Sequence, residues 1–332
     1  MSSSDRSSGG SAGTDDPSDE SPPSVGRRRQ NKKSKIEERF KNLSEYTKRN
    51  GKIFTVSRLH NLDVREVAIK SYKKTIRERI RGVLASRTGA TYKVDAIFEL
   101  RKGLAETRHD EDTICIEVVV TPPTEEDNDE VYRVEDAKSV YLGYLISRGR
   151  DKAYKYAAQL PVLLSFKGTN SIVSSINSTL EVLFDCIVRP FEFCSEYMEQ
   201  ILVKCLTVST EDKPTIVLGV TAPNFKNDEI AELALLAENF KDLQRILKTS
   251  NEEELQRRSQ ALFENFYLGM RENSKMNLSR CSLIKFKLQG IILHNSGKFL
   301  ISNTEVMAVF LRSICQLCLS IEVDHLSRVG LT

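Results

Sequence analysis

Two carboxylates in the amino-terminal third of the chain occupy positions where a metal-dependent nuclease would carry its ligands. Asp95 and Glu117 lie on two segments with the pattern of β-strands. Val118 and Val119 follow Glu117, so no lysine stands two residues after the second carboxylate. The alternative interpretation is that both side chains face solvent, as most carboxylates do. The missing lysine favours this alternative. A DNA-processing enzyme such as a nuclease, or a generic DNA-binding protein, remains the competing class of function.

One pair of cysteines, Cys315 and Cys318, has the spacing of a zinc site. A structural zinc site needs two more ligands, and Cys281 or His294 would have to supply them. Both cysteines lie in an apolar, helix-like segment, which favours packing in the core because cysteine is among the most buried residue types. The four histidines are scattered, and no glycine-rich loop ending in Gly-Lys-Ser or Gly-Lys-Thr is present. The sequence therefore predicts no enzyme, no cofactor, no small-molecule substrate and no metal site.

Positive charge is concentrated in one part of the chain. Residues 26–108 contain 24 Lys and Arg and 9 Asp and Glu, a net charge of +15, while the rest of the chain carries −12. Within residues 65–87, basic side chains recur at helical spacing, namely Lys70, Lys73, Lys74, Arg77 and Arg81. Such a stripe can contact DNA phosphates without reading the base sequence. The alternative is a solvated helix face, although only Glu66 and Glu78 interrupt this one.

The first 50 residues are predicted to form a disordered tail. Residues 2–24 are mostly Ser, Gly, Asp, Glu and Pro, and they cannot bury enough apolar surface to offset chain entropy. A basic cluster typical of a nuclear import signal follows: Arg27, Arg28, Arg29, Lys32, Lys33 and Lys35. A solvated linker is the alternative interpretation of this cluster.

Behind the tail, apolar periodicity predicts an α+β fold, with a mostly antiparallel sheet and helices packed on it. Strands are predicted at 53–56, 92–98, 113–120, 139–146, 215–220, 284–288 and 299–301. Helices are predicted at 65–87, 172–184, 194–206, 230–247, 251–270 and 306–319, while 160–165 fits either type. Asp63 is expected to cap the first helix, and Asn251 to form a capping box with Glu254. We predict an amino-terminal part, 51–206, and a carboxyl-terminal part, 207–332, within one continuous body at 51–325.

The carboxyl-terminal hairpin is the candidate surface for a protein partner. A strand with free backbone groups can pair with a strand of another chain. The residues predicted to bind the partner are Ile284, Phe286, Leu288, Phe299 and Ile301. The alternative is an internal hairpin covered by the last helix.

Cysteine usage predicts a reducing compartment. The chain has seven cysteines, an odd number, and most lie in apolar patterns, which suits the cytosol or the nucleus. No apolar run has the pattern of a signal peptide. The apolar stretch 306–323 is interrupted by Arg312, Gln316 and Glu322, so neither a membrane span nor a membrane partner is expected.

Several segments together resemble the centromere protein L family of inner-kinetochore subunits. In the middle of the chain the likeness lies in Leu160-Pro161, Thr169-Asn170-Ser171, Phe184-Asp185-Cys186 and Pro190-Phe191. Towards the end it lies in Leu262-Phe263, Tyr267, Lys275, Leu278-Ser279, Leu283 and the hairpin through Gly297-Lys298. The sibling centromere protein N family is the nearest alternative, but its amino-terminal domain has no counterpart here.

The resemblance implies a non-enzymatic scaffold of the nucleus, at the centromere and kinetochore of the chromosome. It implies a heterodimer with centromere protein N through the carboxyl-terminal sheet, and contact with centromeric nucleosomes or DNA and other inner-kinetochore subunits. Such a protein would act in chromosome segregation during mitotic cell division. By position, the strands at 283–288 and 299–301 would form the pairing surface. The family offers no defined DNA-contact motif, so the basic residues named above rest on charge alone.

Overall fold

Alternating apolar residues build one large antiparallel sheet. The computed structural model describes residues 43–101, 112–123, 136–147, 162–209, 215–221, 230–236, 240–249, 251–274, 278 and 281–328. The strands are β1 (Arg49–Val56), β2 (Lys93–Arg101), β3 (Thr113–Thr121), β4 (Lys138–Ile146), β5 (Val162–Lys167), β6 (Val188–Pro190), β7 (Thr215–Thr221), β8 (Ala231–Leu236), β9 (Ser282–Leu288), β10 (Ile291–His294) and β11 (Lys298–Ile301). Their order is β2-β3-β4-β5-β1-β11-β10-β9-β7-β8, and β6 also pairs with β1.

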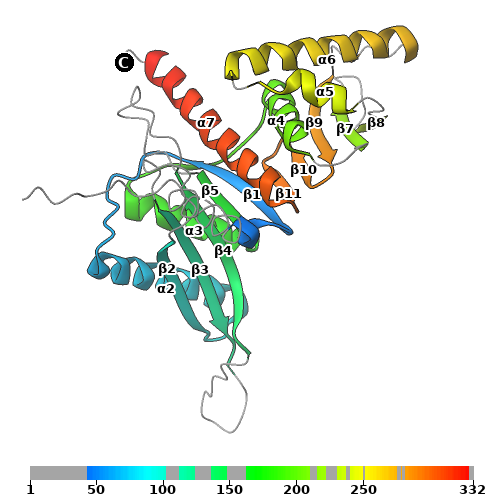
Figure 1. Ribbon diagram of the computed structural model, residues 1–332. Coiled ribbons are helices and arrows are strands. Elements are labelled where there is room, and N and C mark those ends of the chain that lie inside the picture. The colour runs from blue at the N-terminus through cyan, green and yellow to red at the C-terminus, as the bar shows by residue number, and fades with distance from the viewer. Residues whose placement is uncertain are drawn as a thin grey trace, which may run out of the picture. The chain divides into compact units, whose positions relative to one another are not determined.

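Helices complete the α+β fold, which confirms the predicted class (Figure 1). They are η1 (Ser44–Tyr46), α2 (Glu66–Thr88), α3 (Asn170–Phe184), α4 (Ser195–Val208), α5 (Phe240–Leu247), α6 (Glu252–Ser274) and α7 (Thr304–Arg328). In the segment that fitted either type, the described residues 162–165 belong to the strand β5. Residues 1–42 of the predicted tail, with the basic cluster, lie outside the described residues. Over residues 43–50 the predicted tail is wrong, because these residues form η1 and the start of β1, and the side chains of Leu43 and Tyr46 are buried.

Strand β1 joins the early and late parts of the sequence. On one side it pairs with β11, with Arg49 opposite Ile301, and on the other with β5, with Phe54 opposite Leu163. Because β1 and β11 lie about 250 residues apart in the sequence, the sheet is continuous only when these two distant segments pair. The division of the body at residue 206 stays a prediction.

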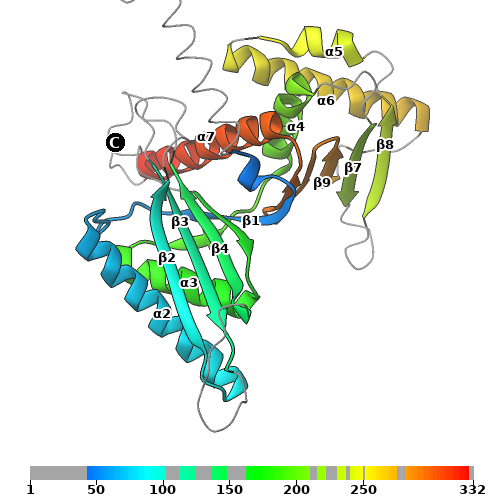
Figure 2. The same cartoon turned by 60° about the horizontal axis from the view of Figure 1, so that its bottom comes forward.

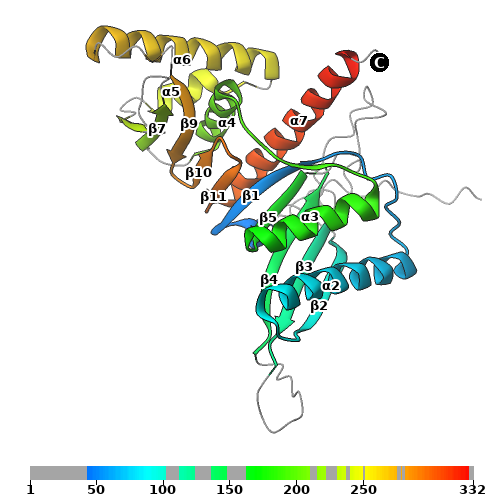
Figure 3. The same cartoon turned by 180° about the vertical axis from the view of Figure 1, so that it is seen from behind.

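The two faces of the sheet bury separate apolar cores. Helices α2 and α3 cover one face of the strands from β2 to β5, lying behind them in Figure 1 and in front of them in Figure 3. The opposite face, in the later part of the sheet, packs against α4 and α7, and α6 packs on α4. The apolar stripe predicted for α3 is confirmed, because Ile172, Ile176 and Leu180 are all buried. In α2 the buried side chains are Tyr72 and Ile76 with Ile80.

The predicted helix at 230–247 is wrong in its first half. Residues Ala231–Leu236 form β8, which pairs with β7 from Val220 opposite Ala231 to Thr215 opposite Leu236. Only Phe240–Leu247 is helical. The apolar residues fit both periods in this short segment, and the neighbouring strand decides because it pairs the backbone N–H and C=O groups.

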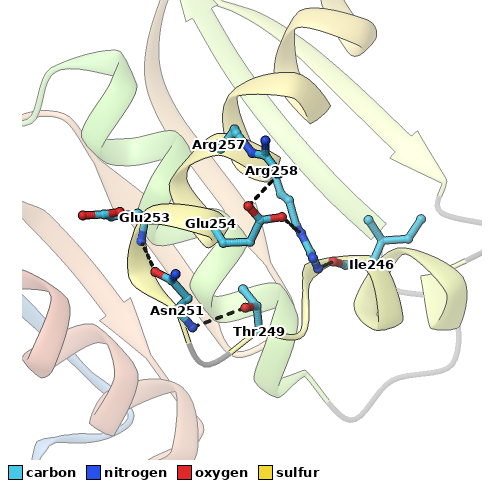
Figure 4. Close-up of polar contacts among 7 residues, drawn as sticks. All are labelled: Ile246, Thr249, Asn251, Glu253, Glu254, Arg257 and Arg258. Carbon is cyan, nitrogen blue, oxygen red and sulfur yellow. Dashed lines mark hydrogen bonds and ion pairs between the residues drawn. The ribbon is translucent and has the colours of Figure 1, made fainter.

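The start of α6 differs in part from its prediction (Figure 4). The backbone N–H of Glu253 donates to Asn251 Oδ1 over 3.0 Å, so Asn251 does cap the helix. The reciprocal bond of a capping box is absent, because the Asn251 N–H donates to Thr249 Oγ1 over 3.2 Å. Asp63 is likewise displaced from its predicted role. Arg65 is the N-cap residue of α2, and its N–H donates to Asp63 Oδ1 over 2.9 Å.

The carboxylate of Glu254 binds two arginines of α6 instead of closing the box, and one of these arginines ties α6 to α5 (Figure 4). It accepts a hydrogen bond of 2.7 Å from Arg258 Nε and forms an ion pair of 2.7 Å with Arg257. Arg258 also donates to the backbone carbonyl of Ile246 at the end of α5. These two arginines hold the pKa of the Glu254 carboxyl below its usual range, so the carboxylate is charged at neutral pH.

Candidate functional site

The basic stripe of α2 lies on the helix surface away from the core. The stripe comprises Lys70, Lys73, Lys74, Arg77 and Arg81, and each is at least partly exposed. Another side of the helix carries the buried Tyr72, Ile76 and Ile80, which fix the stripe's orientation. The structure therefore brings the five predicted nucleic-acid residues together on one outward surface.

Two of the five cations are already engaged by neighbouring carboxylates. Lys70 Nζ lies 2.8 Å from Glu66, and Lys74 Nζ lies 3.9 Å from Glu78, each one helical turn away. The hydrogen bond from Lys70 lowers the pKa of the Glu66 carboxyl. Such exposed pairs are weak, so a phosphate can displace the carboxylate. Lys73 and the two arginines form no ion pair with any described residue.

The hairpin residues predicted to bind a partner lie mostly in the core. Phe286, Leu288, Phe299 and Ile301 are each at most 3 % exposed, and only Ile284 is partly accessible. Strand β9 is paired on both sides, with β10 and β7, and β11 is paired with β10 and β1. The expectation of an open strand edge at this hairpin is therefore corrected. Its backbone groups are used within the chain, and α4 and α7 cover its apolar face.

The carboxylates tested as nuclease ligands lie on neighbouring strands of the sheet. Asp95 on β2 stands opposite Val119, and Glu117 on β3 stands opposite Ile97. Asp95 is exposed, and its Oδ1 accepts a hydrogen bond of 2.9 Å from the Ala96 N–H. Among the described residues, no group of three or more His, Cys, Asp or Glu could hold a metal ion.

Five of the seven cysteines are buried and pack as small apolar side chains. Cys315 and Cys318 are 4 % and 8 % exposed and belong to the core between the sheet and α7, which confirms their predicted packing. Burial raises the pKa of the Cys205 thiol to about 12 and that of the Cys115 thiol to about 11. These two thiols are protonated at neutral pH, and a protonated thiol is a poor nucleophile and a poor metal ligand.

Sequence reasoning missed a second cationic surface, a groove of about 920 Å³ beside α3. The amines of Lys52, Lys167, Lys285 and Lys298 come from four different strands and line it. The alternation of lysines along β9 carried a partial signal, because it placed Lys285 and Lys287 on one face. Pairing of β1 with both β5 and β11 brings in the other lysines, and no local pattern reports that pairing.

No helix among the described residues has the length and apolar character needed to cross a membrane.

Comparison with known protein families gives a match. Residues 48–319 match the family model described as Centromere protein L. The chain belongs to the centromere protein L family. The match covers the sheet from β1 onwards and every described helix from α2 to α6, with most of α7. A search of curated proteins finds no match to the chain.

Membership of the centromere protein L family makes the chain a structural component of the centromere and kinetochore. Its place is therefore the chromosome, in the nucleus, and its process is chromosome segregation. Its partners are, in general, inner-kinetochore proteins.

Proposed function

We propose that the chain is a non-enzymatic scaffold that pairs with centromere protein N and holds centromeric chromatin for segregation. The α2 stripe is the main support for the proposed contact with chromatin. Its five basic side chains share one accessible surface of a helix whose buried face packs against the sheet. Positive side chains at this spacing bind phosphates and release counterions, which gives affinity without base recognition.

The carboxyl-terminal end of the sheet supports the partner contact. Among the described residues, no strand pairs with the outer side of β8 (Figure 2). The other margin, β2, carries the charged side chains Lys93, Asp95, Glu99 and Arg101, and charges on an edge strand discourage pairing with another chain. Along β8 the only charged side chain is Glu232. We therefore move the proposed pairing surface from the hairpin to β8.

Hydrogen–deuterium exchange of the chain with and without centromere protein N tests this edge. A partner strand that pairs with β8 takes up its outward N–H groups, so peptides covering 231–236 are expected to exchange more slowly in the complex. Peptides covering α2 serve as the internal control and are expected to keep their rates. Unchanged exchange in β8 together with slower exchange elsewhere would place the interface at that other segment.

A plasmid-cleavage assay separates the scaffold from the nuclease alternative. With Mg²⁺ or Mn²⁺ present, the purified chain is expected to leave supercoiled DNA intact, because Asp95 and Glu117 have no third ligand among the described residues. The variant Asp95→Ala/Glu117→Ala is expected to match the unaltered chain. Nicking that depends on the metal and disappears in the double variant would refute the proposal.

A further inference from the structure

The groove beside α3 has a mixed chemical character, which restricts its ligand. Its lining residues come from β1, β10 and β11, which form the floor, and from α3, which forms one wall. Floor and wall present apolar groups, including Ile292, Leu300 and Val173. A ligand that fills the groove therefore has apolar atoms as well as groups that complement its lysines.

The charge of the groove is strongly positive. Lys167 and Lys298 are exposed and form no ion pair with a described residue. Lys52 lies over the ring of Phe54, with Nζ 5.3 Å from its centroid. Lys285 is the one groove lysine with a carboxylate partner in the described structure, Glu232 at 2.9 Å. The amines of Lys167 and Lys298 thus remain available to an anion.

The single carboxylate that lines the groove already accepts a hydrogen bond from the backbone. Glu181 Oε1 accepts a hydrogen bond of 2.9 Å from the Val188 N–H. His294, between Lys285 and Lys298, stays neutral. Burial lowers its pKa, and the two neighbouring ammonium groups lower it further. A neutral imidazole can donate or accept a hydrogen bond without changing the charge of the groove.

The wall formed by α3 offers short polar side chains at helical spacing. Asn170, Ser174, Asn177 and Ser178 face the groove from successive turns. Amides and hydroxyls of this kind both donate and accept hydrogen bonds, as the backbone of an extended peptide requires. No acidic residue lies in the first turn of α3, so nothing there opposes an anion.

We propose that this groove binds a segment of a partner protein that carries phosphoserine or phosphothreonine between apolar residues. A phosphate brings nearly two negative charges and three acceptor oxygens, which suits several amines in one groove. Apolar flanking side chains suit the apolar floor. A groove of this volume encloses a ligand of limited size, whereas a DNA duplex presents an extended backbone with no apolar side chains. This inference goes beyond the proposed function and does not depend on DNA binding by α2.

Binding of labelled peptides to the full-length chain tests the inference. The probes are fluorescein-labelled peptides with one phosphoserine or phosphothreonine between apolar residues, and the same peptides without phosphate, followed by anisotropy. The phosphorylated forms are expected to bind more tightly. Lys167→Gln/Lys298→Gln is expected to weaken them by about tenfold for each lost amine. Lys167→Arg/Lys298→Arg keeps both charges and is expected to retain binding.

Matched controls separate this site from the α2 stripe. Arg77→Ala/Arg81→Ala removes two charges outside the groove and is expected to leave peptide affinity unchanged. Because Lys167 and Lys298 are exposed, the groove variants are expected to fold, and circular dichroism checks this. Equal affinity for phosphorylated and unphosphorylated peptides would overturn the inference. Loss of duplex-DNA affinity in Lys167→Gln/Lys298→Gln without loss of peptide affinity would also overturn it, by making the groove a DNA surface.

Discussion

Replacing Phe286 with Asp is expected to unfold the chain, and not merely to detach a partner. Phe286 is 0 % exposed, in the centre of the core between β9 and the helices of that face. Loss of a buried phenylalanine ring alone costs about 3–5 kcal/mol, and an unpaired buried carboxylate adds a further penalty. Since a domain's free energy of unfolding is about 5–15 kcal/mol, this one change removes most of it.

Urea denaturation followed by circular dichroism measures the effect of Phe286→Asp. Lys287→Asp is the matched control, because it places the same residue at the adjacent exposed position of β9. That control is expected to keep a midpoint close to that of the unaltered chain. Phe286→Leu, which preserves apolar character, is expected to lie between the two. An unaltered midpoint for Phe286→Asp would show that this side chain is not in the core, and would restore the hairpin as a candidate interface.

Removing the α2 stripe is expected to weaken binding to duplex DNA and to flatten its salt dependence. Each lost phosphate contact reduces the slope of log K against log salt concentration by about 0.9. Lys70→Ala/Lys74→Ala/Arg77→Ala/Arg81→Ala is therefore expected to reduce it by about 3 to 4 if all four side chains touch phosphates. The two lysines must first leave Glu66 and Glu78. We accordingly expect Arg77→Ala/Arg81→Ala to account for more than half of the loss in affinity.

Electrophoretic mobility or anisotropy titrations from low to physiological salt give the slope. Lys248→Ala/Arg271→Ala is the control, because it removes two exposed charges from α5–α6 and leaves the stripe intact. If only the net charge of the chain mattered, this control would lower the slope as much as Arg77→Ala/Arg81→Ala does. Equal slopes for the two double variants would contradict the assignment of DNA contacts to α2.

Elements with long, unambiguous periodicity could be predicted from the sequence. The stripe of α3 and the basic stripe of α2 follow from spacing of about 3.6 residues, and the strict alternation of Ile284-Lys285-Phe286-Lys287-Leu288 fits only a strand. The residue types at the helix ends predicted the capping bonds less well. Asn251 caps α6, but Glu254 bonds to two arginines in place of the Asn251 N–H, because a stronger charged partner is close in space.

The two candidate sites also differ in whether the sequence alone could predict them. The α2 stripe lies on a single helix, so the sequence alone brings its five cations together. The groove beside α3 needs lysines from β1, β5, β9 and β11, whose separation along the chain hides their proximity. The hairpin residues were assigned to a partner because their apolar pattern is the same for a core and for an interface.

By itself, the amino-acid order determined the fold class, the outward cationic face of α2 and the apolar character of the last hairpin. These depend on the period with which side chains repeat, which is a local property. Only the tertiary structure decided that residues 231–236 form a strand, that β8 and not the hairpin lies at the sheet margin, and that four lysines meet in one groove. Strand neighbours are chosen by hydrogen bonding between segments far apart in the chain, and no single segment encodes that choice.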